Sequence, residues 1–258
     1  MRCRPATCGK PGSGETSVEM TYNYPDVRLR TFIAADSRDV LEGVLRRVYS
    51  WMALGLFITA GIATFVSASP LFKVLPGKPL IFLGLLIVEL ALVMNLSWRI
   101  NRLSTATAIS LFLIFAVLNG LTLSTLFVVY SLGSVAYTFL ASAALFGLMS
   151  IIGYTTRINL AKMSTFLLMG IIGLIIAMFV NILWANSTLG WILTFAGILL
   201  FLGLTMFDTQ RIKRMTATAL QQNHEDFETR LGIKGALNLY LDFVNLFLLP
   251  LRLSGRRH

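Results

Sequence analysis

The stretch MSTFLLMGIIGLIIAMFVNILWANSTLGWILTFAGILLFLGLTMF, residues 163–207, contains no Asp, Glu, Lys or Arg. A helix of about 20 mainly apolar residues crosses the hydrocarbon core of a bilayer, so the stretch is long enough for two crossings. Polar and turn-forming residues interrupt it at Asn186, Ser187, Thr188 and Gly190. It therefore predicts two membrane-spanning helices joined by a short turn.

Other long runs of the chain carry no charge or a single acidic residue. Ser131, Gly133 and Ser134 divide one of them, residues 103–156, into two helices. Continuous apolar runs without strand-like alternation favour a helical bundle over a membrane barrel, whose strands have only about 9 to 11 residues. The predicted spans are 47–68, 79–98, 105–130, 134–155, 163–184, 189–208 and 235–252.

The composition also indicates a membrane protein. Of the 258 residues, 56% are hydrophobic and only 13% are charged, whereas soluble domains have about 25% charged residues. We expect an all-α integral membrane protein, a seven-helix bundle in which six helices surround a central, more polar C-terminal helix. Residues 1–44 are predicted to form a flexible cytoplasmic tail, 45–253 the transmembrane domain and 254–258 a short basic tail.

The basic residues predict the orientation of the chain. Residues 1–47 and the connections after the second, fourth and sixth spans contain 17 Lys and Arg, against 2 in the other three connections. Because positively charged loops stay in the cytoplasm, the N-terminus is predicted to be cytoplasmic. A full seventh crossing would place the basic C-terminal tail outside, against this rule, so a full and a half crossing both stay open. The net charge of +10 is dispersed over loops and tails, which favours the lipid bilayer as partner and no nucleic acid.

Two aspartates lie at apolar spans. Asp208 closes the run GLTMFDTQ, and Asp242 lies inside the last span in LYLDFVNLF. A charge in hydrocarbon costs several kcal/mol unless it faces water or a partner, so an intramembrane carboxylate indicates a functional site. Asp242 lies about 10 Å along its helix from Gly235, on the side where the sixth span ends. The two carboxylates are therefore expected to meet in the cytoplasmic half of the bundle.

The seventh span has a polar stripe. Asn238, Asp242, Asn245 and Arg252 are spaced by four, three and seven residues, which places them on one helical face. A helix that faces lipid would not carry such a stripe. The span is therefore predicted to run through the bundle centre with this face toward an internal cavity.

Two carboxylates in contact do not both ionise cheaply, so the pair would titrate as one coupled unit. With one shared proton it would hold two helices together, and with both groups ionised it would repel or bind a hard cation such as Ca²⁺. A plainer interpretation makes Asp208 a solvated helix-end residue paired with Arg211, and Asp242 a structural hydrogen-bonding group. Glu89, in the second span, is either part of the same pathway or a structural partner of an arginine.

These residues belong to segments that resemble one family. FDTQRIK around Asp208, LNLYLDFVNLFL around Asp242 and the segment FGLMSIIGYTTRINLAKMSTFLLMGIIGLIIAMFVNI are similar to the transmembrane Bax inhibitor motif family, most closely to its bacterial members. NGLTLS and RRVYSWMALGL agree as well, and the similarity covers about residues 45–253.

The resemblance implies seven helices and a pH-sensitive calcium-permeable leak channel of the bacterial calcium-leak branch, in the inner membrane. Asp208 and Asp242 match the family's paired aspartate sensor, where a permeating Ca²⁺ would bind transiently without any other cofactor. Glu89 matches an acid of the family's second helix. A basic cluster there implies Arg99 or Arg102 as the salt-bridge partner of the sensor.

The resulting prediction is a non-enzymatic leak for calcium, controlled by protons, with Glu89, Asn238 and Asn245 on the ion pathway. Some bacterial relatives imply an alternative, a membrane regulator that binds a membrane-anchored protease or another membrane partner. An intramembrane aspartyl protease would also use two aspartates on adjacent helices. However, Asp242 lacks the preceding glycines that such enzymes have, so this enzyme class is the least favoured.

Overall fold

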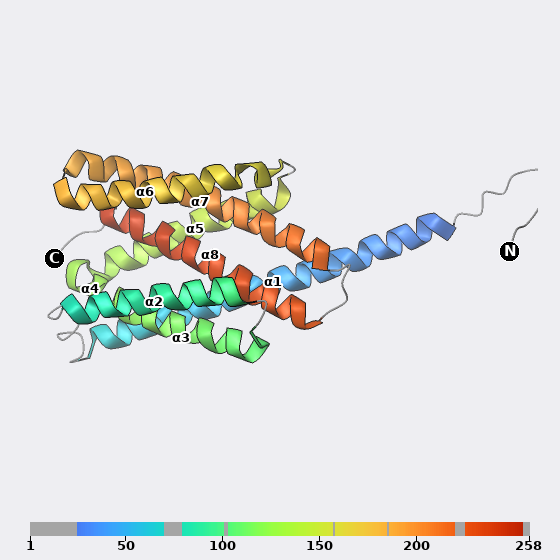
Figure 1. The fold of residues 1–258 in the computed structure, drawn as a ribbon, viewed down its shortest axis with the longest axis horizontal. Helices are drawn as coiled ribbons and strands as arrows, with labels where there is room; N and C mark the ends of the chain where they lie inside the picture. The colour runs from blue at the N-terminus through green and yellow to red at the C-terminus, as the bar shows by residue number, and fades with distance from the viewer. Residues whose placement is uncertain are drawn as a thin grey trace, which may run out of the picture. The chain divides into compact units, whose positions relative to one another are not determined.

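The computed structural model describes residues 25–69, 79–100, 103–156, 158–184, 186–219 and 225–254. These residues form helices and no β-strand (Figure 1). The elements are α1 (Pro25–Ser67), α2 (Pro79–Arg99), α3 (Thr105–Ser124), α4 (Leu126–Val129), α5 (Leu132–Thr155), the 3-10 helix η2 (Leu160–Met163), α6 (Ser164–Trp184), α7 (Ser187–Ala219) and α8 (Glu225–Ser254). The chain divides into two units, 1–36 and 37–258. The described part of the first unit is the beginning of α1, and the following paragraphs concern the second unit.

Seven helices of the described residues are long and apolar enough to cross a membrane. Their apolar portions are Leu41–Ser67, Leu80–Arg99, Thr105–Val129, Leu132–Thr155, Leu160–Trp184, Ser187–Thr216 and Leu231–Leu253. The predicted number, type and order of the spans are therefore confirmed. Large apolar side chains are exposed on their outer faces, among them Phe57, Phe179 and Leu199, as a surface in contact with lipid requires.

Three helices extend well beyond the predicted bounds, namely α1, α7 and α8, which begins at Glu225. α1 begins at Pro25, so residues 25–44, which were predicted as part of the N-terminal tail, are helical; residues 1–24 lie outside the described part, and the division into tail and transmembrane domain stays a prediction. α7 continues through Asp208 to Ala219. No Gly or Pro occurs between residues 204 and 219, and Gln, Arg, Lys and Met are good helix formers. The end of an apolar run is therefore not the end of the helix.

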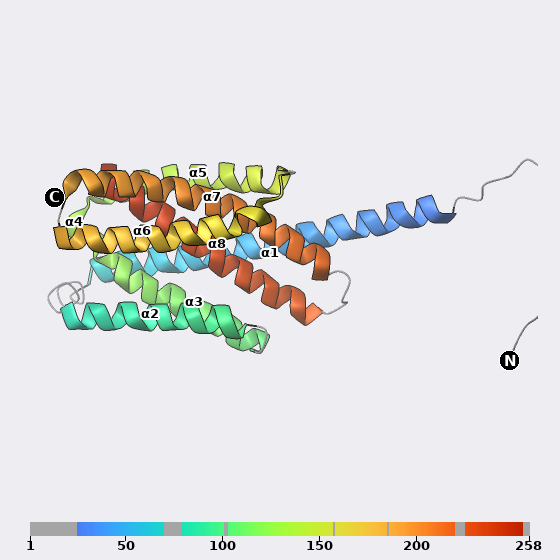
Figure 2. The ribbon, with the colours of Figure 1, turned by 45° about the horizontal axis from the view of Figure 1, so that its top comes forward.

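α8 is the most buried span: 61% of its most apolar window is buried, against 11–33% in the other six. It contacts α3, α5 and α7, and it passes between the α2–α3 pair and the α6–α7 pair in both views (Figure 1, Figure 2). Tyr240 packs edge-on against Phe112 and Phe115 of α3, and Phe243 packs against Phe139 and Phe146 of α5. Its enclosure by all six other helices remains a prediction.

A close contact between Gly153 and the α7 backbone joins α5 to α7. A Cβ atom added to Gly153 would lie 2.5 Å from the Met206 carbonyl oxygen, which belongs to the α7 backbone. Small residues let two helices approach this closely where lipid provides no hydrophobic driving force for their association. The contact fixes α7 just before Asp208, and it therefore positions that carboxylate.

We predict that Gly153→Ala destabilises the protein although alanine is the better helix former. The added methyl group must displace backbone, and such overpacking typically costs about 1–3 kcal/mol. Gly147→Ala, on the same helix, is the matched control because nothing lies within 4 Å of its added Cβ. Thermal unfolding in detergent should show a lower melting temperature for Gly153→Ala only. A Gly153→Ala protein that melts at or above the wild-type temperature would contradict this packing.

Candidate functional site

Two buried carboxylates from different helices line the same cavity. Asp208 of α7 is 8% exposed and Asp242 of α8 is 6% exposed. Both line a cavity of about 1190 Å³ whose walls come mainly from α6, α7 and α8. Asp208 is therefore not a solvated helix-end residue, because α7 continues past it and buries it.

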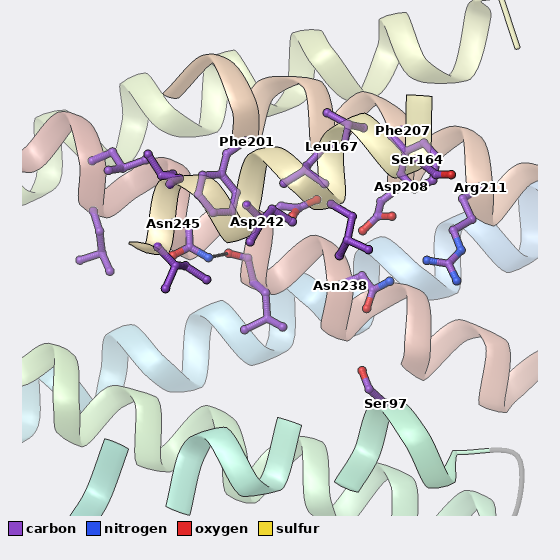
Figure 3. A pocket seen from close by; sticks show the side chains of 18 of the residues that line it. Ser97, Ser164, Leu167, Phe201, Phe207, Asp208, Arg211, Asn238, Asp242 and Asn245 are labelled. Atoms are coloured by element: carbon purple, nitrogen blue, oxygen red, sulfur yellow. Dashed lines mark hydrogen bonds between the residues drawn. The ribbon is translucent and has the colours of Figure 1, made fainter. Parts of the chain in front are cut away.

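The cavity is apolar over most of its wall and polar along one side. Leu167 of α6 and Phe201 and Phe207 of α7 are among the apolar lining residues (Figure 3). The polar residues labelled in the same view are Ser97, Ser164, Asp208, Arg211, Asn238, Asp242 and Asn245. An apolar cavity with a few convergent polar groups is the usual form of a binding site or of a permeation path.

The two aspartates interact electrostatically across the α7–α8 interface, and the interaction is a repulsion when both are ionised. No hydrogen bond joins the two carboxylates, and Asp242 Oδ2 has no hydrogen-bond partner among the described residues. Buried polar atoms are normally satisfied, and an exception suggests a role other than stability. The arrangement leaves an acceptor atom available for a proton, a water molecule or a cation.

Arg211 is the cation that acts on this pair. It lies one helical turn after Asp208 on α7 and attracts that carboxylate. In Figure 3, Asp208 lies between Asp242 and Arg211. The Asp208 carboxylate therefore interacts with a negative neighbour on α8 and a positive neighbour on its own helix.

The structure places the whole predicted stripe of α8 on the cavity. Asn238, Asp242, Asn245 and Arg252 all line it. The Asn245 side chain donates a hydrogen bond from Nδ2 to the Leu241 carbonyl oxygen at 2.8 Å. This local bond uses the amide nitrogen and leaves the carboxamide oxygen as the remaining polar atom of that side chain.

Glu89 lies in a different polar cluster, away from the residues that line the cavity. It is buried on α2, and the Thr122 hydroxyl of α3 donates a hydrogen bond to its carboxylate. Tyr240 of α8 interacts electrostatically with Glu89, and its hydroxyl bonds that of Thr59 at 2.7 Å. The structure therefore does not bring Glu89 together with the two aspartates.

Of the two arginines predicted as partners of the pair, the structure describes only Arg99. Arg99 is exposed and does not line the cavity, and Arg102 lies outside the described residues. The arginines that do line the cavity are Arg211, Arg214 and Arg252. Sequence reasoning gave Arg211 only a structural role, although its spacing of three residues from Asp208 already indicated proximity.

Gln210 is a second residue whose importance the sequence did not indicate. It is buried, accepts a hydrogen bond from Leu160 N at 2.9 Å and donates one to the Ile158 carbonyl oxygen at 2.7 Å. Arg214 donates to Gln210 Oε1 at 2.5 Å and to Asn159 Oδ1 at 2.6 Å. These bonds attach the connection between α5 and α6 to α7, two residues from Asp208.

The oxygen atoms at the cavity suit a hard cation but do not complete its coordination. Calcium takes six to eight oxygen ligands. The described residues contain no group of three or more His, Cys, Asp or Glu that could hold a metal ion. The two carboxylates and the amide oxygens of Asn238 and Asn245 are among the oxygen atoms that line the cavity. A calcium ion there would keep part of its hydration shell, as a passing ion does.

A match between this sequence and a family-wide sequence pattern identifies the protein's family. The sequence pattern described as "Inhibitor of apoptosis-promoting Bax1" matches residues 41–258. The chain therefore belongs to the Bax inhibitor family of membrane proteins, as the resemblance in the sequence predicted. It is 39% identical over 218 residues to "Inner membrane protein YbhL" of Escherichia coli, which covers 84% of this chain and 93% of that protein.

Uncharacterized relatives occur in other bacteria. One from Borreliella burgdorferi is 37% identical over 83% of this chain and 91% of its own length. One from Deinococcus radiodurans is 38% identical over 85% and 93%, respectively. The family pattern matches residues 41–258, a range that contains the seven apolar spans.

We predict that the two aspartates are energetically coupled. At alkaline pH, Asp208→Asn and Asp242→Asn each remove the same repulsion, and Asp208→Asn also removes the attraction to Arg211. Asp242→Asn should therefore raise the free energy of unfolding in mixed micelles more than Asp208→Asn does. The double variant should gain less than the sum of the two, by about 1 kcal/mol, as expected for residues in direct interaction. At acid pH the coupling should disappear, because protonation removes the repulsion.

A matched control is the pair Asp242→Asn and Glu89→Gln. Glu89 does not line the cavity, so these two substitutions should be additive at both pH values. If Asp208→Asn and Asp242→Asn are equally additive at alkaline pH, the two carboxylates do not interact.

Proposed function

We propose that the protein is a pH-sensitive, calcium-permeable leak of the bacterial inner membrane, with a cytoplasmic N-terminus and without enzymatic activity. Its gate is the Asp208–Asp242 pair. The observation that carries this proposal is that two buried acidic side chains from adjacent spans interact at one cavity. Membrane proteins keep such groups where ions or protons pass.

The length of the cavity supports a pathway rather than a closed pocket. Its lining on α8 extends from Asn238 to Arg252, a separation of fourteen residues that covers about 21 Å of helix. The hydrocarbon core of a bilayer is about 30 Å thick. The cavity therefore extends over most of the membrane's apolar thickness, with Asp242 about 6 Å from its Asn238 end along α8.

The proposed gate works through charge. With one proton on the pair, the repulsion between α7 and α8 is absent and the cavity offers little attraction to a divalent cation. With both carboxylates ionised, the local charge attracts Ca²⁺, and the two helices repel each other. Arg211 competes with the cation for Asp208, so it takes the part that the sequence assigned to Arg99 or Arg102.

The proposal is tested by calcium flux into dye-loaded proteoliposomes across a pH series. We expect wild-type flux to depend on pH, and Asp242→Asn and Asp208→Asn to flatten that dependence and to lower the flux at alkaline pH severalfold. Glu42→Gln is the matched control, because it removes an exposed carboxylate of α1 that does not line the cavity. Glu89→Gln should keep the pH dependence, since Glu89 does not line the cavity.

Wild-type protein without calcium flux, or a pH profile shared by wild type and both aspartate variants, would contradict the proposal. A specific membrane partner recovered with a flux-silent protein would instead favour a regulatory role. Substrate cleavage that Asp242→Asn abolishes would favour an intramembrane aspartyl protease.

A further inference from the structure

A second, smaller cavity lies where α6 ends and α7 begins. Its volume is about 310 Å³. Its lining comes from Asn181 near the end of α6, from the first two turns of α7 and from the end of α8. Most of these side chains are polar, namely Asn181, Asn186, Ser187, Thr194 and Arg252. The cavity is therefore a polar recess at the end of the bundle where α8 terminates.

Arg252 lines both cavities. It lies in the last turn of α8, seven residues after Asn245 on the polar stripe, and its side chain is exposed. It is the one charged side chain among the described residues that line the second cavity. A full positive charge therefore lies at the boundary between the polar recess and the cavity that contains the aspartates.

We propose that Arg252 is a charge filter between the two cavities. Small solutes reach the Asp208–Asp242 region from this end through the recess, and the guanidinium group slows cations and favours anions on the way. The relevance of the filter to calcium rests on the proposed function, whereas the access route and its charge preference do not. Arg252 would then limit the leak at the end opposite to Arg211.

The size of the effect follows from the spacing. Asn245 and Arg252 are about 10 Å apart along the helix axis. One unit charge at that distance, with an effective dielectric constant of about 20, changes the local concentration of a monovalent ion on the order of tenfold. A reactive group placed at residue 245 should therefore detect the charge of Arg252.

Thiol labelling tests the filter without any flux measurement. In a Cys3→Ser, Cys8→Ser background, Asn245→Cys is the reporter, and Leu248→Cys, which also lines the first cavity, is a second reporter. The reagents are methanethiosulfonates that carry either a sulfonate or a trimethylammonium group. We expect the anionic reagent to react faster, and Arg252→Gln to lower the ratio of anionic to cationic rates on the order of a hundredfold, because the charge acts on the two reagents in opposite directions.

Lys162→Gln is the matched control. This substitution removes one exposed positive charge from η2, and Lys162 lines neither cavity. The ratio of anionic to cationic rates should therefore stay as in the parent protein. An unchanged ratio in Arg252→Gln would overturn the proposal. So would reporters at both positions that neither reagent modifies, because no access route would then pass Arg252.

Calcium flux separates this inference from the function on which it builds. If the leak exists, Arg252→Gln should increase the flux severalfold at every pH while the pH dependence stays. If wild-type protein shows no flux but the labelling ratio falls in Arg252→Gln, the filter stands and the proposed calcium leak fails.

Discussion

The structure depends on a carboxylate pair held where the bilayer would otherwise exclude it. Asp208 and Asp242 are both buried, interact with each other and come from helices that pack directly together. Isolated charges at this depth are costly, so the surrounding structure must provide what water would provide. It does so with the positive charge of Arg211 beside Asp208 and with a cavity wide enough for water, which Asn238 and Asn245 also line.

The position of the pair depends on α8, whose two faces make different contacts. One face packs Tyr240 and Phe243 into the aromatic cluster formed with α3 and α5, and this packing fixes the rotation of the helix. The opposite face then has to present its polar residues to the cavity. Gly153 and Gln210 hold α7 in a similar way on either side of Asp208. The aspartates are thus positioned by apolar packing and hydrogen bonds at some distance from them.

Charge-free runs and turn residues were sufficient to predict the seven helices and their order, since a bilayer imposes both their length and their composition. The spacing of Asn238, Asp242 and Asn245 likewise predicted a shared face. The role of Gln210 could not be predicted, because its partners Ile158 and Leu160 are distant in sequence. The sequence also predicted that Glu89 lies within the membrane, on the second span. It did not indicate that Glu89 lies away from the cavity, because its position around α8 depends on the packing of α2 and α3. The sequence predicted an end of α7 that was too early, because a helix can continue after its residues stop being apolar.

The central claim is that Asp208 and Asp242 act as one titrating unit, and infrared spectroscopy of the protein in lipid tests it most directly. If the pair shares a proton, a pH-titration difference spectrum should contain a protonated carboxylic acid band that both Asp208→Asn and Asp242→Asn shift or abolish, whereas Glu89→Gln leaves it unchanged. A carboxylic acid band of Asp242 that Asp208→Asn does not affect, with the same titration midpoint as in the wild type, would contradict the claim.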